Sequence, residues 1–186
     1  MLAITVVPLL FFLHAYAATL VDRQFPHLIV PVKQDEPDRA FNTQYSGEIA
    51  VKAGAHQVYT EISFDVPTNA AQTCNLAFTI APANGPWTLS GDPAAGPLVF
   101  NISSLPNASI NKDKDTWNSR PKSQEWVASV EVAYNGNVKL TGGSVVCAKG
   151  SAQQFVMYPG SARDFGLTWF ELTQPLHGVT YEMYVP

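Results

Sequence analysis

Residues 58–66 read Val58-Tyr59-Thr60-Glu61-Ile62-Ser63-Phe64-Asp65-Val66. Apolar or β-branched side chains occupy the even positions and mostly polar ones the odd positions. This period of two is typical of a half-buried β-strand, because successive side chains of a strand point to opposite faces of a sheet. Pro67 ends the pattern, since proline has no backbone N–H for the strand ladder. We therefore predict a strand over 58–66, with the even positions facing the core and the odd positions, Glu61 among them, facing solvent.

The same alternation recurs in the part of the chain that follows this stretch. It predicts further strands at 73–80, 98–103, 126–134, 138–140, 145–147, 153–158, 165–172 and 179–185. Asn135-Gly136 lies between two of them and is typical of a two-residue type I′ hairpin turn. No stretch has a convincing helical period. Short strands separated by Gly, Pro and Asn predict an all-β fold, an antiparallel β-sandwich or a flattened barrel, as a single domain over 18–186.

Residues 1–17 are a predicted secretory signal peptide. An apolar run from Leu2 to Leu13 precedes Ala15-Tyr16-Ala17, a small-x-small pattern that predicts cleavage before Ala18. The run is shorter than the about 20 residues that a transmembrane helix needs. Its n-region has no positive side chain, and the alternative is a buried N-terminal core segment. We expect a secreted protein, extracellular or associated with a cell wall.

Cys74 and Cys147 are the two cysteines of the chain. In an oxidising secretory compartment an even pair predicts a disulfide, and two unpaired buried thiols are the alternative. Cys74 falls on the apolar phase of its predicted strand, where a disulfide between two sheets would lie.

Charge and spacing exclude several classes of ligand. The net charge is −4, with 11 Lys and Arg against 15 Asp and Glu, so we expect no nucleic-acid partner. The run Lys112-Asp113-Lys114-Asp115 alternates in sign and predicts a solvated loop. The scattered histidines lack metal-site spacing, so no metal and no cofactor are expected. Residues 182–186 lack the hydrophobic tail of a glycolipid-anchor signal, so no membrane anchor is expected.

Several blocks of the chain resemble one domain family. The blocks are His27–Val32, Gln44–Glu48, Ile62–Pro67, Cys74–Phe78 and Cys147–Gly150 with Gln154-Phe155, and Pro175–Tyr181 resembles a final strand. In this order they resemble the fungal But-two C-terminal domain family, whose members are secreted, cysteine-poor β proteins. The family's name implies binding to a subunit of an activating enzyme for a ubiquitin-like modifier. A signal peptide would keep the chain from that cytosolic or nuclear partner, and the resemblance implies no catalytic residues.

A hydrolase would need two converging carboxylates. Glu61 and Asp65 share one strand face but lie roughly 13 Å apart at about 3.3 Å per residue, too far for a glycosidase pair. A partner for Glu61 from another strand, Glu48, Glu131, Glu171 or Glu182, stays open, although alternation places each of them toward solvent. We find no nucleophile motif, so no catalytic residue is assigned.

Tryptophans in predicted loops are better candidates for ligand contact. Trp87 and Trp117 carry flat rings suited to stacking on sugars or anchoring a protein partner, and core packing is the alternative. Two sequons, Asn101-Ile102-Ser103 and Asn107-Ala108-Ser109, predict N-glycosylation at Asn101 and Asn107, with chance occurrence as the alternative.

These observations favour a secreted fungal, non-enzymatic β-sandwich glycoprotein that binds a cell-wall polysaccharide or an extracellular protein. Two alternatives stay open: a carbohydrate-active hydrolase whose carboxylates converge from separate strands, and a structural wall or coat protein. The oligomeric state does not follow from the sequence.

Overall fold

The computed structural model describes residues 18–80 and 85–186, so the predicted leader lies outside the described residues. Within them the chain forms strands and one short 3₁₀ turn at Pro93–Ala95. The strands are β1 (Thr19–Gln24), β2 (Leu28–Lys33), β3 (Ser46–Lys52), β4 (Ala55–Val66), β5 (Thr73–Thr79), β6 (Trp87–Gly91), β7 (Leu98–Ser104), β8 (Trp126–Val132), β9 (Val138–Gly142), β10 (Ser144–Val145), β11 (Ser151–Pro159), β12 (Phe165–Phe170) and β13 (Gly178–Val185).

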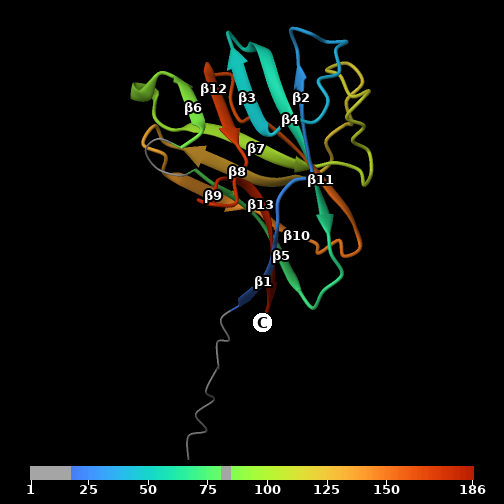
Figure 1. The fold of residues 1–186 in the computed structure, drawn as a ribbon. Helices are drawn as coiled ribbons and strands as arrows, with labels where there is room; N and C mark the ends of the chain where they lie inside the picture. The colour runs from blue at the N-terminus through green and yellow to red at the C-terminus, as the bar shows by residue number, and fades with distance from the viewer. Residues whose placement is uncertain (1–17, 81–84) are drawn as a thin grey trace, which may run out of the picture.

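The strands form two antiparallel sheets, which confirms the predicted β-sandwich (Figure 1). The larger sheet has the order β6-β12-β3-β4-β11-β7-β8-β9, and β2 pairs with β4 off this path. The smaller sheet has the order β1-β13-β5-β10. β4, the strand predicted from 58–66, is the longest and pairs with β2, β3 and β11.

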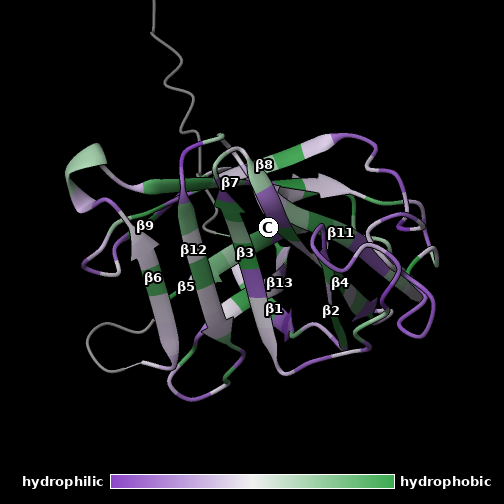
Figure 2. Ribbon diagram, turned by 90° about the horizontal axis from the view of Figure 1, so that it is seen from above, coloured by the Kyte–Doolittle hydropathy of each residue, from purple (hydrophilic) through white to green (hydrophobic). Residues whose placement is uncertain are grey.

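Aromatic side chains of the two sheets meet in the core. Phe64 of β4 lies 5.6 Å from Tyr181 of β13, measured between ring centroids. Phe78 of β5 contacts Phe100 of β7 at 5.2 Å and Trp169 of β12 at 5.4 Å, both edge to face. Edge-to-face aromatic pairs contribute about 0.5–1.5 kcal/mol beyond their buried area, so these contacts fix how the sheets stack. Hydrophobic residues accordingly concentrate in the strands and hydrophilic ones in the connections (Figure 2).

The hairpin between β8 and β9 forms where predicted, with Val132 opposite Val138. Its turn differs from the predicted type I′, because Gly136 (φ 84°) has a positive φ and Asn135 does not. The Gly136 N–H instead donates to the carbonyl of Ala133 (2.9 Å), and Asn137 accepts from the Ala133 N–H (2.9 Å). One left-handed residue after an ordinary turn makes a bulged, longer connection.

The predicted disulfide between Cys74 and Cys147 is confirmed, with a Cα–Cα distance of 5.3 Å. It joins β5 to the connection between β10 and β11, and β10 itself pairs with β5. The bond therefore ties two neighbouring parts of the smaller sheet at the point where the chain crosses to the larger one, rather than bridging facing strands of the two sheets.

Among the residues that the structure describes, no helix is long and apolar enough to span a bilayer.

Candidate functional site

The outer face of β4 carries a cleft of about 590 Å³. Tyr59 of β4 and Tyr158 of β11 form its sheet side, and the connection between β7 and β8 supplies its other side. Its lining residues are Tyr59, Trp117, Asn118, Arg120, Pro121, Lys122, Ser123 and Tyr158. We call this the aromatic cleft.

Three aromatic rings pack together along the aromatic cleft. The Tyr59 ring lies 4.9 Å from Trp117, edge to face, and 5.6 Å from Tyr158. All three side chains are half-buried, so each combines a fixed position with an accessible surface. The Tyr59 hydroxyl donates to Gln57 (2.7 Å), and the Tyr158 hydroxyl bonds to Ser103 (3.0 Å). The polar ends of the two tyrosine rings are thus held, and the exposed parts of all three side chains border the cleft.

Arg120 stacks on this aromatic group. Its guanidinium carbon lies 3.9 Å from the centroid of Trp117 and 5.2 Å from that of Tyr59, in the range of cation–π contacts. Its Nη1 donates to the Trp117 carbonyl. Among the described residues no carboxylate oxygen lies within 4.0 Å of it.

Two carboxyl groups lie buried beneath this surface. Glu61 of β4 has no solvent-exposed surface, and Asp115 from the β7–β8 connection is 5% exposed. Within residues 18–80 and 85–186, no hydrogen-bond donor faces either carboxyl oxygen of Glu61, and the side chain that it meets is the Asp115 carboxyl. Two carboxyls bond to each other only when one of them carries a proton.

Burial, and after it the neighbouring Asp115 carboxyl, raise the pKa of Glu61 to about 9 against the smaller, lowering effect of the Arg120 charge. Burial also raises the pKa of Asp115, while the bond that its Oδ2 accepts from the Asn111 N–H (2.6 Å) lowers it. The pair therefore holds a proton at neutral pH. Neither carboxyl belongs to the residues that line the cleft.

Residues 105–125, which connect β7 to β8, cover the face of β4 that was predicted to be exposed. Leu105 and Ile110 pack with Val30 of β2 and Val156 of β11 in a second apolar cluster. Gln154 of β11 accepts from the backbone N–H groups of Ser109 (2.7 Å) and Ile110 (3.0 Å). The Gln154 amide also donates to Ser63 of β4 (3.2 Å), so one side chain joins the segment to the sheet.

A neighbouring segment, residues 34–45 between β2 and β3, supports residues 105–125. The Asn118 amide donates to Asp38 (2.8 Å), and the Asn42 amide donates to Asp113 (2.7 Å). The segments, blue and yellow in Figure 1, lie side by side at one end of the structure.

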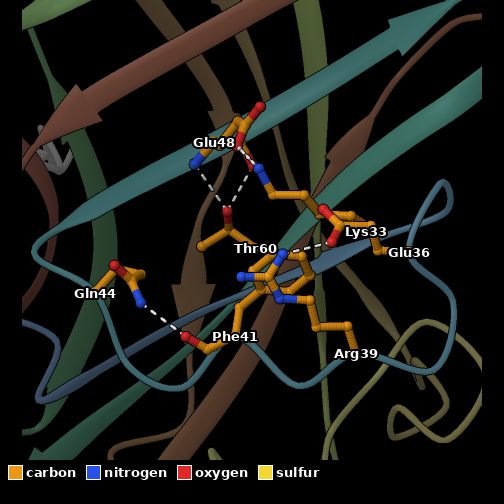
Figure 3. A network of polar contacts seen from close by, with 7 residues as sticks. All are labelled: Lys33, Glu36, Arg39, Phe41, Gln44, Glu48 and Thr60. Carbon is orange, nitrogen blue, oxygen red and sulfur yellow. Dashed lines mark hydrogen bonds and ion pairs between the residues drawn. The ribbon is translucent and has the colours of Figure 1, made fainter.

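Polar contacts anchor residues 34–45 to the sheet (Figure 3). Lys33 pairs with Glu48 (2.6 Å), whose backbone bonds to the Thr60 hydroxyl. Lys33 Nζ also lies 5.3 Å from the centroid of the Phe41 ring, which joins the segment to β2. The guanidinium of Arg39 lies 4.7 Å from the same ring and pairs with Glu36. Because each cation here has an acidic partner, we interpret this cluster as a support for the segment.

Trp117 lies in the aromatic cleft, whereas Trp87 does not. Trp87 lies on β6 opposite Trp169 of β12, near one edge of the larger sheet, and packs against the main core. The structure therefore does not bring the two predicted ligand-binding tryptophans together.

The two predicted glycosylation sites differ in their surroundings. Asn101 is half-buried within β7, and its side-chain oxygen accepts from Ser129 of β8 (2.6 Å). Asn107 is exposed in the connection after β7.

Several acidic residues are buried against expectation. Glu61 and Asp115 were expected to face solvent, and residues 105–125 bury both. Glu171 is half-buried, and its carboxyl group accepts from Trp169 Nε1 (2.8 Å) and the Val179 N–H (3.0 Å). Glu182 is 9% exposed and pairs with Arg23 of β1 (2.8 Å). Strand alternation marks which face a residue is on, and it carries no information about what covers that face.

Sequence reasoning missed Arg120 and Lys122 as cleft residues, and it missed Asp115 as the partner of Glu61. Trp117 and Arg120 are three residues apart, and Pro121 follows. This spacing is a local signal of a turn in which the arginine stacks on the tryptophan ring. Among the described residues, no group of three His, Cys, Asp or Glu side chains is placed to hold a metal ion.

The described residues thus form an all-β sandwich with an aromatic cleft on the outer face of its larger sheet. The model of the Ubiquitin 3 binding protein But2 C-terminal domain matches residues 24–175, and the chain belongs to this family. The description fits a non-enzymatic, protein-binding role and identifies no partner of this chain. No curated protein matches the sequence.

Proposed function

We propose that this chain is a secreted, non-enzymatic binding protein of the extracellular space or the fungal cell wall, and that it binds polysaccharide in the aromatic cleft. The observation that carries the proposal is the set of three half-exposed rings, Tyr59, Trp117 and Tyr158, held in an open groove. Flat rings with fixed orientation match the apolar faces of sugar rings and lose little conformational freedom on binding.

Three observations support secretion. The predicted leader ends at Ala17, and β1 begins at Thr19, so cleavage before Ala18 leaves every described strand intact. The Cys74–Cys147 disulfide is of the kind that persists in oxidising compartments. Asn107 is exposed, as an N-glycosylation acceptor must be.

The adjoining Glu61 and Asp115 carboxyls favour a second candidate, a carbohydrate-active hydrolase. Their burial argues against it, because a general acid must reach the bond that it protonates and Glu61 has no exposed surface.

The test is retention of the purified protein on a panel of neutral and acidic wall polysaccharides. We expect retention by at least one of them, lost in Trp117→Ala and kept in Trp87→Ala, the matched substitution outside the cleft. Retention unaffected by Trp117→Ala would exclude the cleft. Release of reducing ends that stops with Glu61→Gln would favour the hydrolase, and binding of an extracellular protein alone would point to a protein partner.

A further inference from the structure

The aromatic cleft is locally cationic on an acidic protein. The chain has a net charge of −4, yet the cleft lining includes Arg120 and Lys122 and no Asp or Glu. The carboxyl pair below holds one proton, and the negative charge that remains on it is covered by residues 105–125. A ligand in the cleft therefore meets two positive charges and no exposed negative one.

Arg120 is oriented before any ligand arrives. Its stacking on Trp117 and Tyr59 and its bond to the Trp117 carbonyl hold the guanidinium in place. A guanidinium has five N–H donors in a planar fork, and one of its nitrogens is engaged here. Since no carboxylate of the described residues pairs with it, the remaining donors are available for a planar, two-oxygen acceptor.

Lys122 adds a second charge beside this donor set. Its side chain is exposed, and it makes no hydrogen bond or ion pair with the described residues. Most other cations near the site are compensated, as Lys33 is by Glu48 and Arg39 by Glu36. An unpaired lysine next to an oriented arginine suits successive negative charges along an extended ligand.

The aromatic rings and the two cations of the cleft would each bind a different chemical group of the same ligand. The rings suit the apolar face of a sugar, and the fork of Arg120 suits a carboxylate. A sugar whose ring carries a carboxylate satisfies both at once. A neutral glycan would leave the two cations unmatched, and an acidic peptide would leave the ring faces without a flat partner.

We propose that the aromatic cleft binds an acidic polysaccharide of uronic-acid units. Arg120 donates hydrogen bonds to one carboxylate, Lys122 attracts the next, and Trp117 and Tyr59 stack on a sugar face. This inference rests on the proposed function and specifies its ligand class.

The test compares polygalacturonate with the same polymer after its carboxyl groups are reduced to alcohols, by titration calorimetry on the disulfide-bonded protein. We expect the acidic polymer to bind at least tenfold more tightly at low salt, and its affinity to fall as salt screens the charges. Arg120→Gln should weaken binding roughly tenfold to a hundredfold, as expected for losing a charge-assisted bond pair. Lys122→Gln, which breaks no hydrogen bond or ion pair of the described residues, should weaken it by a smaller factor and reduce the salt dependence. Lys149→Gln removes the same charge from an exposed position outside the cleft and should bind like the parent protein.

Equal affinity for the two polymers, with loss in Trp117→Ala, would overturn the inference and leave the proposed function standing. No binding of either polymer or of any neutral glycan would overturn both. Unchanged affinity in Lys122→Gln and in a folded Arg120→Gln would place the acidic polymer elsewhere and would also overturn the inference.

Discussion

Replacing Glu61 by Gln tests whether the buried carboxyl pair controls the stability of the fold. Gln has the shape of a protonated Glu and does not ionise, so it keeps the packing of the buried form. Its amide can also donate to the Asp115 carboxyl, which the protonated Glu61 would otherwise do. The substitution therefore removes the titration of Glu61 and little else.

The expected change in the free energy of unfolding follows from the pKa of Glu61. Glu61 has a pKa of about 9 in the fold, against 4.5 for the unperturbed side chain. Between these values the folded state keeps a proton that the unfolded state releases, so the free energy of unfolding falls as pH rises, by about 1.4 kcal/mol for each pH unit. Below about pH 4.5 both states are protonated and this loss is absent. At neutral pH it amounts to about 3 kcal/mol, and Glu61→Gln should be more stable by about that amount.

The assay is urea unfolding followed by tryptophan fluorescence, for both proteins, from about pH 4 to about pH 9. Burial raises the pKa of Glu171 to about 7, which makes the free energy of unfolding depend on pH a second time. This second dependence is common to both proteins and cancels in the difference between their free energies of unfolding. Glu131→Gln, which removes an exposed carboxylate paired with Lys139, is the control and should change stability by less than about 1 kcal/mol. Parallel curves for parent and Glu61→Gln across the whole range would refute the reasoning.

Other substitutions probe the sandwich and the predicted modification. Replacing both Cys74 and Cys147 by Ser should lower the free energy of unfolding by about 4 kcal/mol in urea, since the bond closes a separation of 73 residues, and no change would contradict the loop-entropy argument. Gly47→Ala places a Cβ in space that the Trp169 ring occupies and should cost about 1–3 kcal/mol in thermal unfolding, while a parent-like midpoint would show that the indole can move aside. In protein secreted from a fungal host, Asn107→Gln should remove the mass of one glycan, and an unchanged mass would show that the sequon is not used.

The core strands could be predicted because each sheet buries one face, so apolar and polar side chains alternate along them. This pattern is present in β4, β5, β7, β8, β11, β12 and β13. β3 has it too, with Ile49 and Val51 buried, but Gly47 occupies the third core position and hides the period. Gly47 is needed there because the Trp169 ring fills the space of a side chain. β1 and β6 lie at sheet edges with little buried surface, so their sequences carry no alternation.

The site was predictable only in part. Trp117 was a candidate because an aromatic residue in a polar loop is unusual. Its neighbours Tyr59 and Tyr158 come from strands 99 residues apart, and no local pattern indicates that residues 105–125 fold back over them. The burial of Glu61 depends on the same long-range contact, which Gln154 makes through its two amide atoms.

The aromatic cleft is therefore built from strands and from a connecting segment. Its floor belongs to β4 and β11, whose other faces build the core, while its rim belongs to residues 105–125, a connection that contains no strand of its own. Changes at Trp117, Arg120 or Lys122 leave the strand pairing untouched. The surface of the cleft can therefore change by substitution in its rim while the strand pairing of the sandwich stays the same.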